Sequence, residues 1–214
     1  MGRRYEAASA KASFRASCAE PGAGAHGAPV TTTDTSMPPL PRSFGLRDNE
    51  LELRRLAACD REAFLRACQD PEILRWTTLP DPFTADAVDE FLAEADVHWA
   101  DGSAAELAIV ADGRFVGGTH LVFHTDWRAS VAYWLAPAAL GRGLATRSVR
   151  LITRWGFATF DDLARIELWS IVGNEASDAV ARRAGFVEEG VLRSRLPCRG
   201  NYRDVRCFSL LRGE

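Results

Sequence analysis

The stretch LAPAALGRGLATRSVRLITRWGF, residues 135–157, joins the end of an apolar run to an amphipathic helix. Small residues stand where that helix should begin, namely Gly141, Gly143 and Ala145. None of the usual capping residues (Ser, Thr, Asp or Asn) comes directly before the helix, so its first backbone N–H groups are left bare. A bare helix N-terminus with small residues favours binding of an anion such as a phosphate. A tight strand-to-helix turn without a ligand is the alternative interpretation.

This glycine segment matches neither of two common phosphate-binding motifs. The dinucleotide fingerprint needs a third glycine, which the run from Gly141 to Thr146 lacks. The P-loop needs a lysine before its Ser or Thr, and the segment contains none. Any phosphate bound here would therefore be held by the helix N-terminus itself.

Composition excludes several classes of protein. The chain has 214 residues, of which 47% are hydrophobic, and its formal net charge is -3. It has no apolar run long enough to span a membrane, and the net charge argues against a broad nucleic-acid surface. The five cysteines are scattered without CxxC spacing, which predicts reduced thiols and a cytoplasmic protein.

Two histidines are the best available candidates for a metal pair, and the spacing argues against it. His120 and His124 share one face of a predicted strand, but at that separation they stand about 13 Å apart. This distance is too long for a shared ion, so we expect no metal site.

The chain divides near residue 43. Residues 7–41 are mostly Ala, Ser, Thr, Gly and Pro, and such a segment cannot bury enough apolar surface to offset its ordering entropy. We expect residues 1–43 to form a disordered tail and residues 44–214 to form one domain. Met37 precedes the first periodic segment and is an alternative start of the natural protein.

The domain shows regular patterns of strands and helices from residue 50 onward. The hairpin is the clearest element, because two apolar runs flank the turn pair Asp112-Gly113. Asp60 and Thr84 are candidate helix caps, and Pro71 is expected to stop the first helix. The predicted order is β-α-α-β-β-β-α-β-α-β-β, which is an α+β mixed sheet with helices on its faces.

Four blocks of sequence, in order, resemble the GNAT acyl-CoA N-acyltransferases and, within them, the RimJ/RimL-like branch. The blocks are Tyr133-Trp134-Leu135-x-Pro137, Leu140-Gly141-Arg142-Gly143-Leu144-Ala145, Asn174-x-x-Ser177 with Ala184-Gly185-Phe186-x-x-Glu189-Gly190, and Arg199-Gly200-Asn201-Tyr202-x-Asp204. The likeness covers about residues 44–214. It implies a mostly antiparallel sheet of about six or seven strands, helices on both faces and a splay between the two central strands.

The resemblance also implies a site for acetyl-CoA and no metal. Ser177 would assist departure of the thiolate, and the backbone N–H near Leu135 would stabilise the oxyanion. Plain helix capping is the alternative for Asn174 and Ser177, and a solvated helix face for Arg183. The residues expected to hold the cofactor are Trp134, Leu135, Leu140, Gly141, Arg142, Gly143, Leu144, Ala145, Thr146, Asn174 and Arg183.

Two positions depart from the family pattern. Leu140 replaces the usual Gln or Arg at the start of the loop, so the loop would act through its backbone. Ala181 replaces the tyrosine that many members use as the general acid. The general base is not visible: Glu106, Asp126 and Glu167 are carboxylates near predicted strand ends, and each is more often a surface residue than a base.

Three hypotheses for the function remain open from the sequence. The resemblance favours an N-acetyltransferase for a protein or peptide N-terminal α-amine, acting as a monomer or homodimer. An α-amine has a pKa near 8 and needs less help from a base than an alkyl amine near 10. The alternatives are an acetyltransferase for a small amine (an amino acid, a polyamine or an aminoglycoside) and a CoA-binding module without turnover.

Overall fold

The computed structural model describes residues 40–41 and 43–214. The predicted tail, residues 1–43, therefore lies almost entirely outside the described residues. Leu40 is nevertheless buried, with its N–H directed at the Trp99 carbonyl, and the Trp99 indole donates a 3.2 Å hydrogen bond to the carbonyl of Pro41. The packed domain thus includes Leu40, which precedes the boundary expected from composition.

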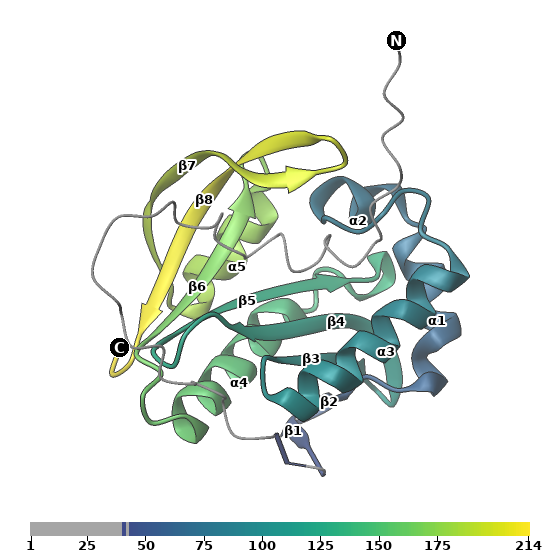
Figure 1. Ribbon diagram of the computed structural model, residues 1–214, viewed down its shortest axis with the longest axis horizontal. Helices are drawn as coiled ribbons and strands as arrows, with labels where there is room; N and C mark the ends of the chain where they lie inside the picture. The colour runs from purple at the N-terminus through teal and green to yellow at the C-terminus, as the bar shows by residue number, and fades with distance from the viewer. Residues whose placement is uncertain (1–39, 42) are drawn as a thin grey trace, which may run out of the picture.

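The described strands form one open sheet (Figure 1). Its order is β1-β2-β3-β4-β5-β6-β8-β7. Only β5 and β6 pair in parallel, and the other neighbours are antiparallel. The strands are β1 (Gly45–Asp48), β2 (Leu51–Arg55), β3 (Ala104–Ala111), β4 (Arg114–Phe123), β5 (Arg128–Leu135), β6 (Arg165–Ile171), β7 (Val187–Cys198) and β8 (Asn201–Leu211).

The predicted mostly antiparallel mixed sheet is confirmed, with one strand more than expected. The additional strand is β1, a short edge strand that pairs only with β2. It shows little hydrophobic periodicity in the sequence because none of its residues is fully buried. The predicted hairpin is confirmed, since Ala111 and Arg114 are cross-strand partners on either side of Asp112-Gly113.

The helices depart from prediction at one place. They are α1 (Arg61–Cys68), α2 (Pro71–Trp76), α3 (Ala85–Asp101), α4 (Leu144–Thr159) and α5 (Glu175–Ala184). Pro71 does not merely end a helix: it occupies the first turn of α2, where its missing N–H costs nothing. Asp70 caps α2 by accepting from the N–H groups of Glu72 and Ile73.

Of the two candidate caps, Thr84 makes the predicted capping bond and Asp60 does not. Thr84 caps α3 by accepting from the N–H of Ala87 at 3.3 Å, as predicted. Asp60 precedes α1, but its side chain makes no capping bond to that helix. Its carboxylate instead binds Arg54 through two 2.7 Å contacts and accepts from the N–H of Ala57, because a bidentate ion pair is the stronger partner.

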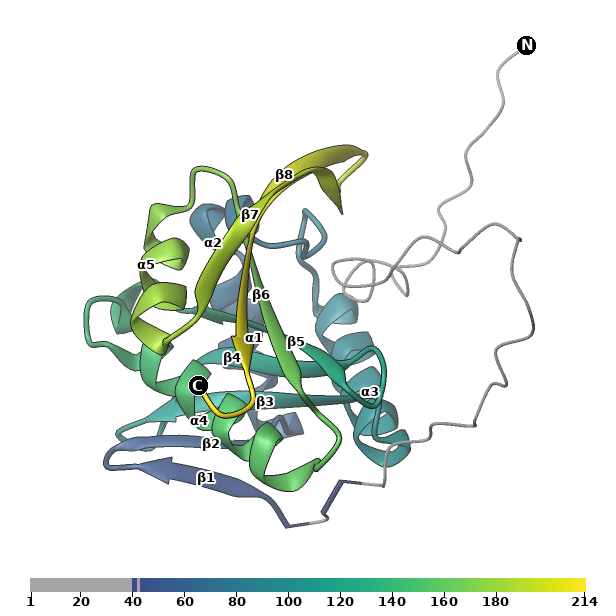
Figure 2. The same ribbon diagram turned by 90° about the vertical axis from the view of Figure 1, so that its left-hand side faces the viewer.

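Helices cover both faces of the sheet (Figure 2). Helices α1 and α3 lie on one face and α4 and α5 on the other. All eight residues of β3 are buried, because this strand lies between both helical layers. No helix in the described part of the chain is long and apolar enough to cross a membrane.

Candidate active site

The central strands β5 and β6 separate along their length. Their parallel pairing runs from Arg128 opposite Arg165 to Val131 opposite Leu168 and stops there, although β5 continues to Leu135. The predicted splay is therefore confirmed. Beyond Val131, the β5 edge that faces β6 has no strand partner among the described strands.

The backbone of Leu135 points into this splay. The N–H of Ala136 bonds to the carbonyl of Val116 on the β4 side. Because successive peptide groups in a strand point to opposite edges, the N–H of Leu135 faces the β6 side. The residue expected to supply an oxyanion donor therefore has a backbone donor aimed at the opening.

A cleft of about 400 Å³ occupies the opening. It reaches both faces of the sheet, since Tyr133 and Ser177 line it from the α4–α5 face, whereas His120 and Trp134 line it from the α1–α3 face. The lining is mostly apolar and aromatic. It consists of Asp70, Glu72, Ile73, Trp76, Thr77, Thr78, His120, Ala132, Tyr133, Trp134, Leu135, Pro137, Leu140, Ala145, Leu168, Trp169, Ser170, Ile171, Asn174, Ala176, Ser177, Val180 and Leu196.

The start of α4 lies at one side of the cleft and has an open N-terminus. Gly141 and Gly143 have φ of 77° and 71°, values that favour glycine, and a Cβ on either would meet no atom within 4 Å. Gly143 is the N-cap residue, and no side chain of the described residues caps the helix there. The start of α4 therefore lacks a side-chain cap, as the sequence predicts.

The side chains of this loop have different surroundings. Leu140 is exposed and lines the cleft, and Ala145 lines it as well. Leu144 and Thr146 are buried, so only their backbone can reach a ligand. The guanidinium of Arg142 pairs with Asp112 at 2.8 Å and is thereby held by the neighbouring hairpin turn.

Asn174 and Ser177 are brought together at the start of α5. The Oδ1 atom of Asn174 accepts from the N–H of Ser177 at 3.1 Å, so Asn174 caps the helix. The hydroxyl of Ser177 is not the cap, and both residues line the cleft. Arg183 lies exposed in the last turn of α5, and its carbonyl accepts from the guanidinium of Arg150.

Tyr133 is a site residue whose role sequence reasoning missed. Its hydroxyl donates to Oγ of Ser177 at 3.3 Å across the opening. Burial raises the pKa of Tyr133 to about 12, so the phenol stays protonated near neutral pH. Ala181, where many relatives have a tyrosine, is fully buried in the core. Tyr133 is part of the first of the four sequence blocks, but only the strand register shows that its side chain faces α5.

Trp134 has its indole on the opposite face of the sheet. The ring stacks on Phe64 of α1 with centroids 5.3 Å apart. Gly118, its cross-strand neighbour, leaves room for it, because a Cβ there would come within 2.9 Å of the indole nitrogen. Trp134 therefore forms a wall of the cleft on the α1–α3 face.

The three candidate carboxylates lie in different places. Asp126 is in the exposed β4–β5 turn, where it accepts from the N–H of Trp127. Glu167 is on β6 and is held by Arg165 and Arg128. Glu106 on β3 is buried and lies opposite His120, which lines the cleft. Only Glu106 is next to a cleft residue in the sheet register.

His124, the second histidine of the candidate metal pair, contacts a serine of β5. Its Nε2 atom lies 2.9 Å from the hydroxyl of Ser130. No group of three or more His, Cys, Asp or Glu side chains that could hold a metal occurs within the described ranges.

A split parallel strand pair beside a bare helix N-terminus is the arrangement that the sequence blocks imply for an acyl-CoA acyltransferase. The family profile described as "Acetyltransferase (GNAT) domain" matches residues 50–187. The chain therefore belongs to the GNAT acetyltransferase family.

The names of individual relatives agree with this family assignment. YdaF of Bacillus subtilis (strain 168), provisionally named a ribosomal N-acetyltransferase, is 33% identical over 119 residues, which cover 55% of this chain and 64% of YdaF. Spermidine N(1)-acetyltransferase of Escherichia coli (strain K12) is 32% identical over 112 residues, covering 51% and 60%. This chain thus spans less than two thirds of the length of both relatives.

Solved structures show the same fold. The structure titled as RimL, a ribosomal L7/L12 alpha-N-protein acetyltransferase in complex with coenzyme A, superposes with a TM-score of 0.70. The alignment covers 77% of this chain and 95% of that chain at 22% identity. At this identity the likeness supports the fold alone.

Proposed function

We propose that this protein transfers the acetyl group of acetyl-CoA to the α-amine of a protein or peptide N-terminus. The observation that carries the proposal is the cleft at the β5–β6 splay, which opens to both faces of the sheet. Such an opening allows a thioester and an amine to approach each other from opposite sides. The fold therefore supplies proximity and orientation, which contribute a large share of the rate of a two-substrate reaction.

Acetyl-CoA would bind on the α4–α5 face. Its amide-rich pantetheine arm would pair with the free edge of β5, and Asn174 would orient the arm. Its pyrophosphate would sit on the bare N–H groups after Gly143, where the helix dipole favours negative charge. Arg183, which is exposed at the end of α5, would approach the 3′-phosphate.

Transfer would proceed by direct attack of the neutral amine on the thioester carbonyl. The N–H of Leu135, which points into the splay, would donate to the oxyanion as its charge develops. The carbon–sulfur bond then breaks, and the departing thiolate receives a hydrogen bond or a proton from Ser177. The Tyr133 hydroxyl, which donates to Ser177, would pass its own proton along the same pair and would regain one from solvent through the cleft after the products leave.

The acidic side chains of the cleft favour an α-amine over a polyamine as acceptor. The cleft contains two carboxylates, and both already have partners. Asp70 caps α2, whereas Glu72 accepts from the Trp76 indole at 3.2 Å and lies 3.5 Å from Arg75. A polycation would need carboxylates that are free to neutralise its additional ammonium groups, since burying an unpaired charge is costly.

A small polyamine is the second candidate acceptor, because one relative is named a spermidine acetyltransferase. A thiol-release assay with acetyl-CoA separates the two classes. The panel contains peptides with a free N-terminus, the same peptides blocked at the N-terminus, spermidine and an aminoglycoside.

We expect kcat/KM to be highest for the free peptides and to vanish when the N-terminus is blocked. Mass spectrometry of the product should place the acetyl group on the α-amine. A preference for spermidine over every peptide would contradict the proposal.

A further inference from the structure

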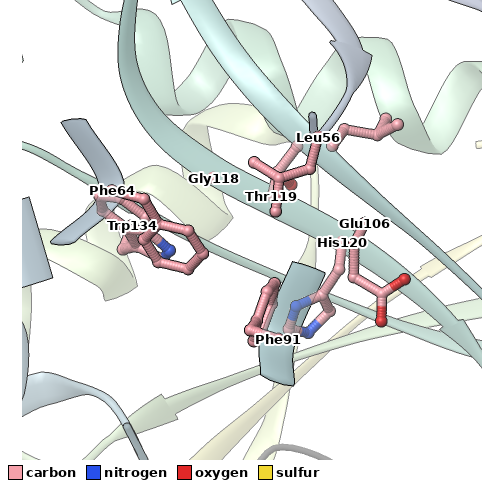
Figure 3. Close-up of a pocket in the computed structure, with 9 residues that line it drawn as sticks. Leu56, Phe64, Phe91, Glu106, Gly118, Thr119, His120 and Trp134 are labelled. Atoms are coloured by element: carbon pink, nitrogen blue, oxygen red, sulfur yellow. The ribbon is translucent and has the colours of Figure 1, made fainter. Parts of the chain in front are cut away.

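A second, much smaller cavity lies beside the cleft on the α1–α3 face (Figure 3). Its volume is about 20 Å³, which is room for a single water molecule. The polar side chains that line it from this face are Glu106 on β3 and His120 on β4. His120 lines both this cavity and the cleft, so its ring forms the partition between them.

Glu106 is the buried acid of this cavity. It is only 6% exposed and lies directly opposite His120 in the β3–β4 register. In Figure 3 the His120 ring lies between Phe91 and the Glu106 carboxylate. The Oε2 atom of Glu106 is buried and has no hydrogen-bond partner among the described residues. A buried carboxylate oxygen without a partner is costly, and one water in the cavity would satisfy it.

The other oxygen of Glu106 leads toward the surface. Its Oε1 atom lies 2.7 Å from Nδ1 of His98 on α3, whose side chain is 17% exposed. Two other titratable groups among the described residues act on this cluster, namely Glu94 of α3 on Glu106 and His124, beyond β4, on His120. His120, Glu106 and His98 thus follow one another from the cleft toward solvent.

The protonation states suit the transfer of a proton. Burial raises the pKa of Glu106 above its ordinary value and so makes it a stronger base near neutral pH. Burial lowers the pKa of His120 to about 3, so this ring is neutral. A neutral imidazole can accept a proton on one nitrogen while it donates from the other.

We propose that His120 and Glu106, bridged by one water in the small cavity, form the relay that removes the proton of the acceptor amine. The acceptor enters as an ammonium ion, and one of its protons passes to a ring nitrogen of His120 before the neutral amine attacks the acetyl carbon. The proton that the nitrogen loses as the amide forms follows the same path. The opposite ring nitrogen releases a proton through the water to Oε2 of Glu106, and His98 returns it to solvent. The electron pair of the broken carbon–sulfur bond leaves with the thiolate.

This inference rests on the acetyl transfer proposed above, but it does not depend on which amine is the natural acceptor. The test uses any amine that the wild-type protein acetylates, whether a peptide or spermidine. A preference for spermidine would therefore contradict the α-amine proposal and leave the relay to be decided by its own variants.

The deciding measurement is the pH dependence of kcat/KM for the amine in Glu106→Gln and His120→Gln, between pH 6.5 and 9.5. We expect each variant to lose about 10²-fold at pH 7. The loss should shrink as the pH approaches the pKa of the amine, because free amine then forms without help. KM for acetyl-CoA should stay within twofold. Glu167→Gln is the matched control, a buried strand glutamate that does not line the cleft, and should show a small loss at every pH.

Two results would overturn the relay. One is a rate within twofold of wild type in Glu106→Gln at pH 7, and the other is a loss of the same size at every pH. A second measurement needs no variant: histidine ring nitrogens observed by NMR in the wild-type protein should show His120 neutral from pH 5.5 to 9. A protonated His120 at pH 6 would have no nitrogen free to accept a proton and would equally contradict the relay.

Discussion

At the scale of single residues, the hydrogen bond between Tyr133 and Ser177 is the feature that changes the chemistry expected from the sequence. A serine alone is a poor acid, whereas a serine that receives a phenol proton can pass one on. The structure also shows which side chain caps α5: the amide oxygen of Asn174 accepts from the backbone N–H of Ser177. The serine hydroxyl is thereby left to act on the cleft side.

We predict that Ser177→Ala and Tyr133→Phe each lower kcat about 10-fold to 10²-fold while KM for acetyl-CoA stays within twofold. The double variant should be little worse than either single variant, because the two hydroxyls act as one unit. Steady-state kinetics of the three variants provide the measurement. Losses that multiply in the double variant would show that the hydroxyls act independently.

Thermal stability distinguishes the role of the Ser177 hydroxyl from that of the Asn174 cap. Ser177→Ala should leave the melting temperature nearly unchanged, since the capping bond uses the backbone N–H of Ser177 rather than its hydroxyl. Asn174→Ala removes the cap and should cost about 1 kcal/mol. A Ser177→Ala variant that keeps its rate within twofold of wild type would end the catalytic role of this residue.

At the scale of elements, the N-terminus of α4 depends on two glycines whose φ angles are positive. The space above them is open, so glycine is required there by backbone conformation and not by neighbouring atoms. This openness is what a pyrophosphate needs. The same geometry in a closed site would indicate only a tight turn.

We predict that Gly143→Glu abolishes the rise in melting temperature that acetyl-CoA produces in wild type, because it adds a negative side chain at the expected pyrophosphate position. Ligand binding to the folded state alone stabilises it by mass action. Gly213→Glu is the control, since Gly213 also has a positive φ and open space but lies near the C-terminus. A full thermal shift in folded Gly143→Glu would move the phosphate site elsewhere.

The β7–β8 hairpin is tied to α2 beside the cleft through one arginine. The guanidinium of Arg199 donates to the carbonyls of Leu74, Thr77 and Leu79 at 2.5, 3.5 and 2.8 Å. These carbonyls lie at and after the C-terminal end of α2, where a cation is favourable. The arginine therefore holds the helix that carries Trp76 against the cleft.

We predict that Arg199→Met raises KM for the acceptor amine about 10-fold and leaves KM for acetyl-CoA unchanged, since the residues proposed to hold acetyl-CoA lie on β5 and on or just before α4 and α5, and none of them lies on α2. Arg199→Lys should restore part of the loss, because one ammonium can replace some of the carbonyl contacts. Arg193→Met, on the exposed part of the same hairpin, serves as the control. Equal increases in both KM values would assign Arg199 a general structural role.

At the scale of the whole molecule, the sheet would divide the proposed reaction between its two faces. Tyr133, Ser177 and the α4 N-terminus lie on the face of α4 and α5, where the thiolate would leave. His120 and Glu106 lie on the face of α1 and α3, where the amine would arrive. Side chains of neighbouring residues in a strand point to opposite faces, so β5 alone can supply Tyr133 to one side and Trp134 to the other.

The sequence by itself determined the family, the α+β order of elements, the turn at Asp112-Gly113 and the bare start of α4. These are local properties, because turns, helix ends and amphipathic periods depend on residues close together in the chain. It did not predict the short strand β1 or the start of α2 at Pro71. Neither element has enough periodic residues to stand out from its neighbours.

Only the tertiary structure decided which side chains meet. Tyr133 and Ser177 are far apart in sequence, and their contact depends on the strand register and on the packing of α5. Glu106, His120 and His98 come from two strands and a helix, and their isolated sequence contexts are ordinary. Burial in the assembled fold raises the pKa of Glu106 and lowers that of His120, because removing a group from water disfavours its charged form.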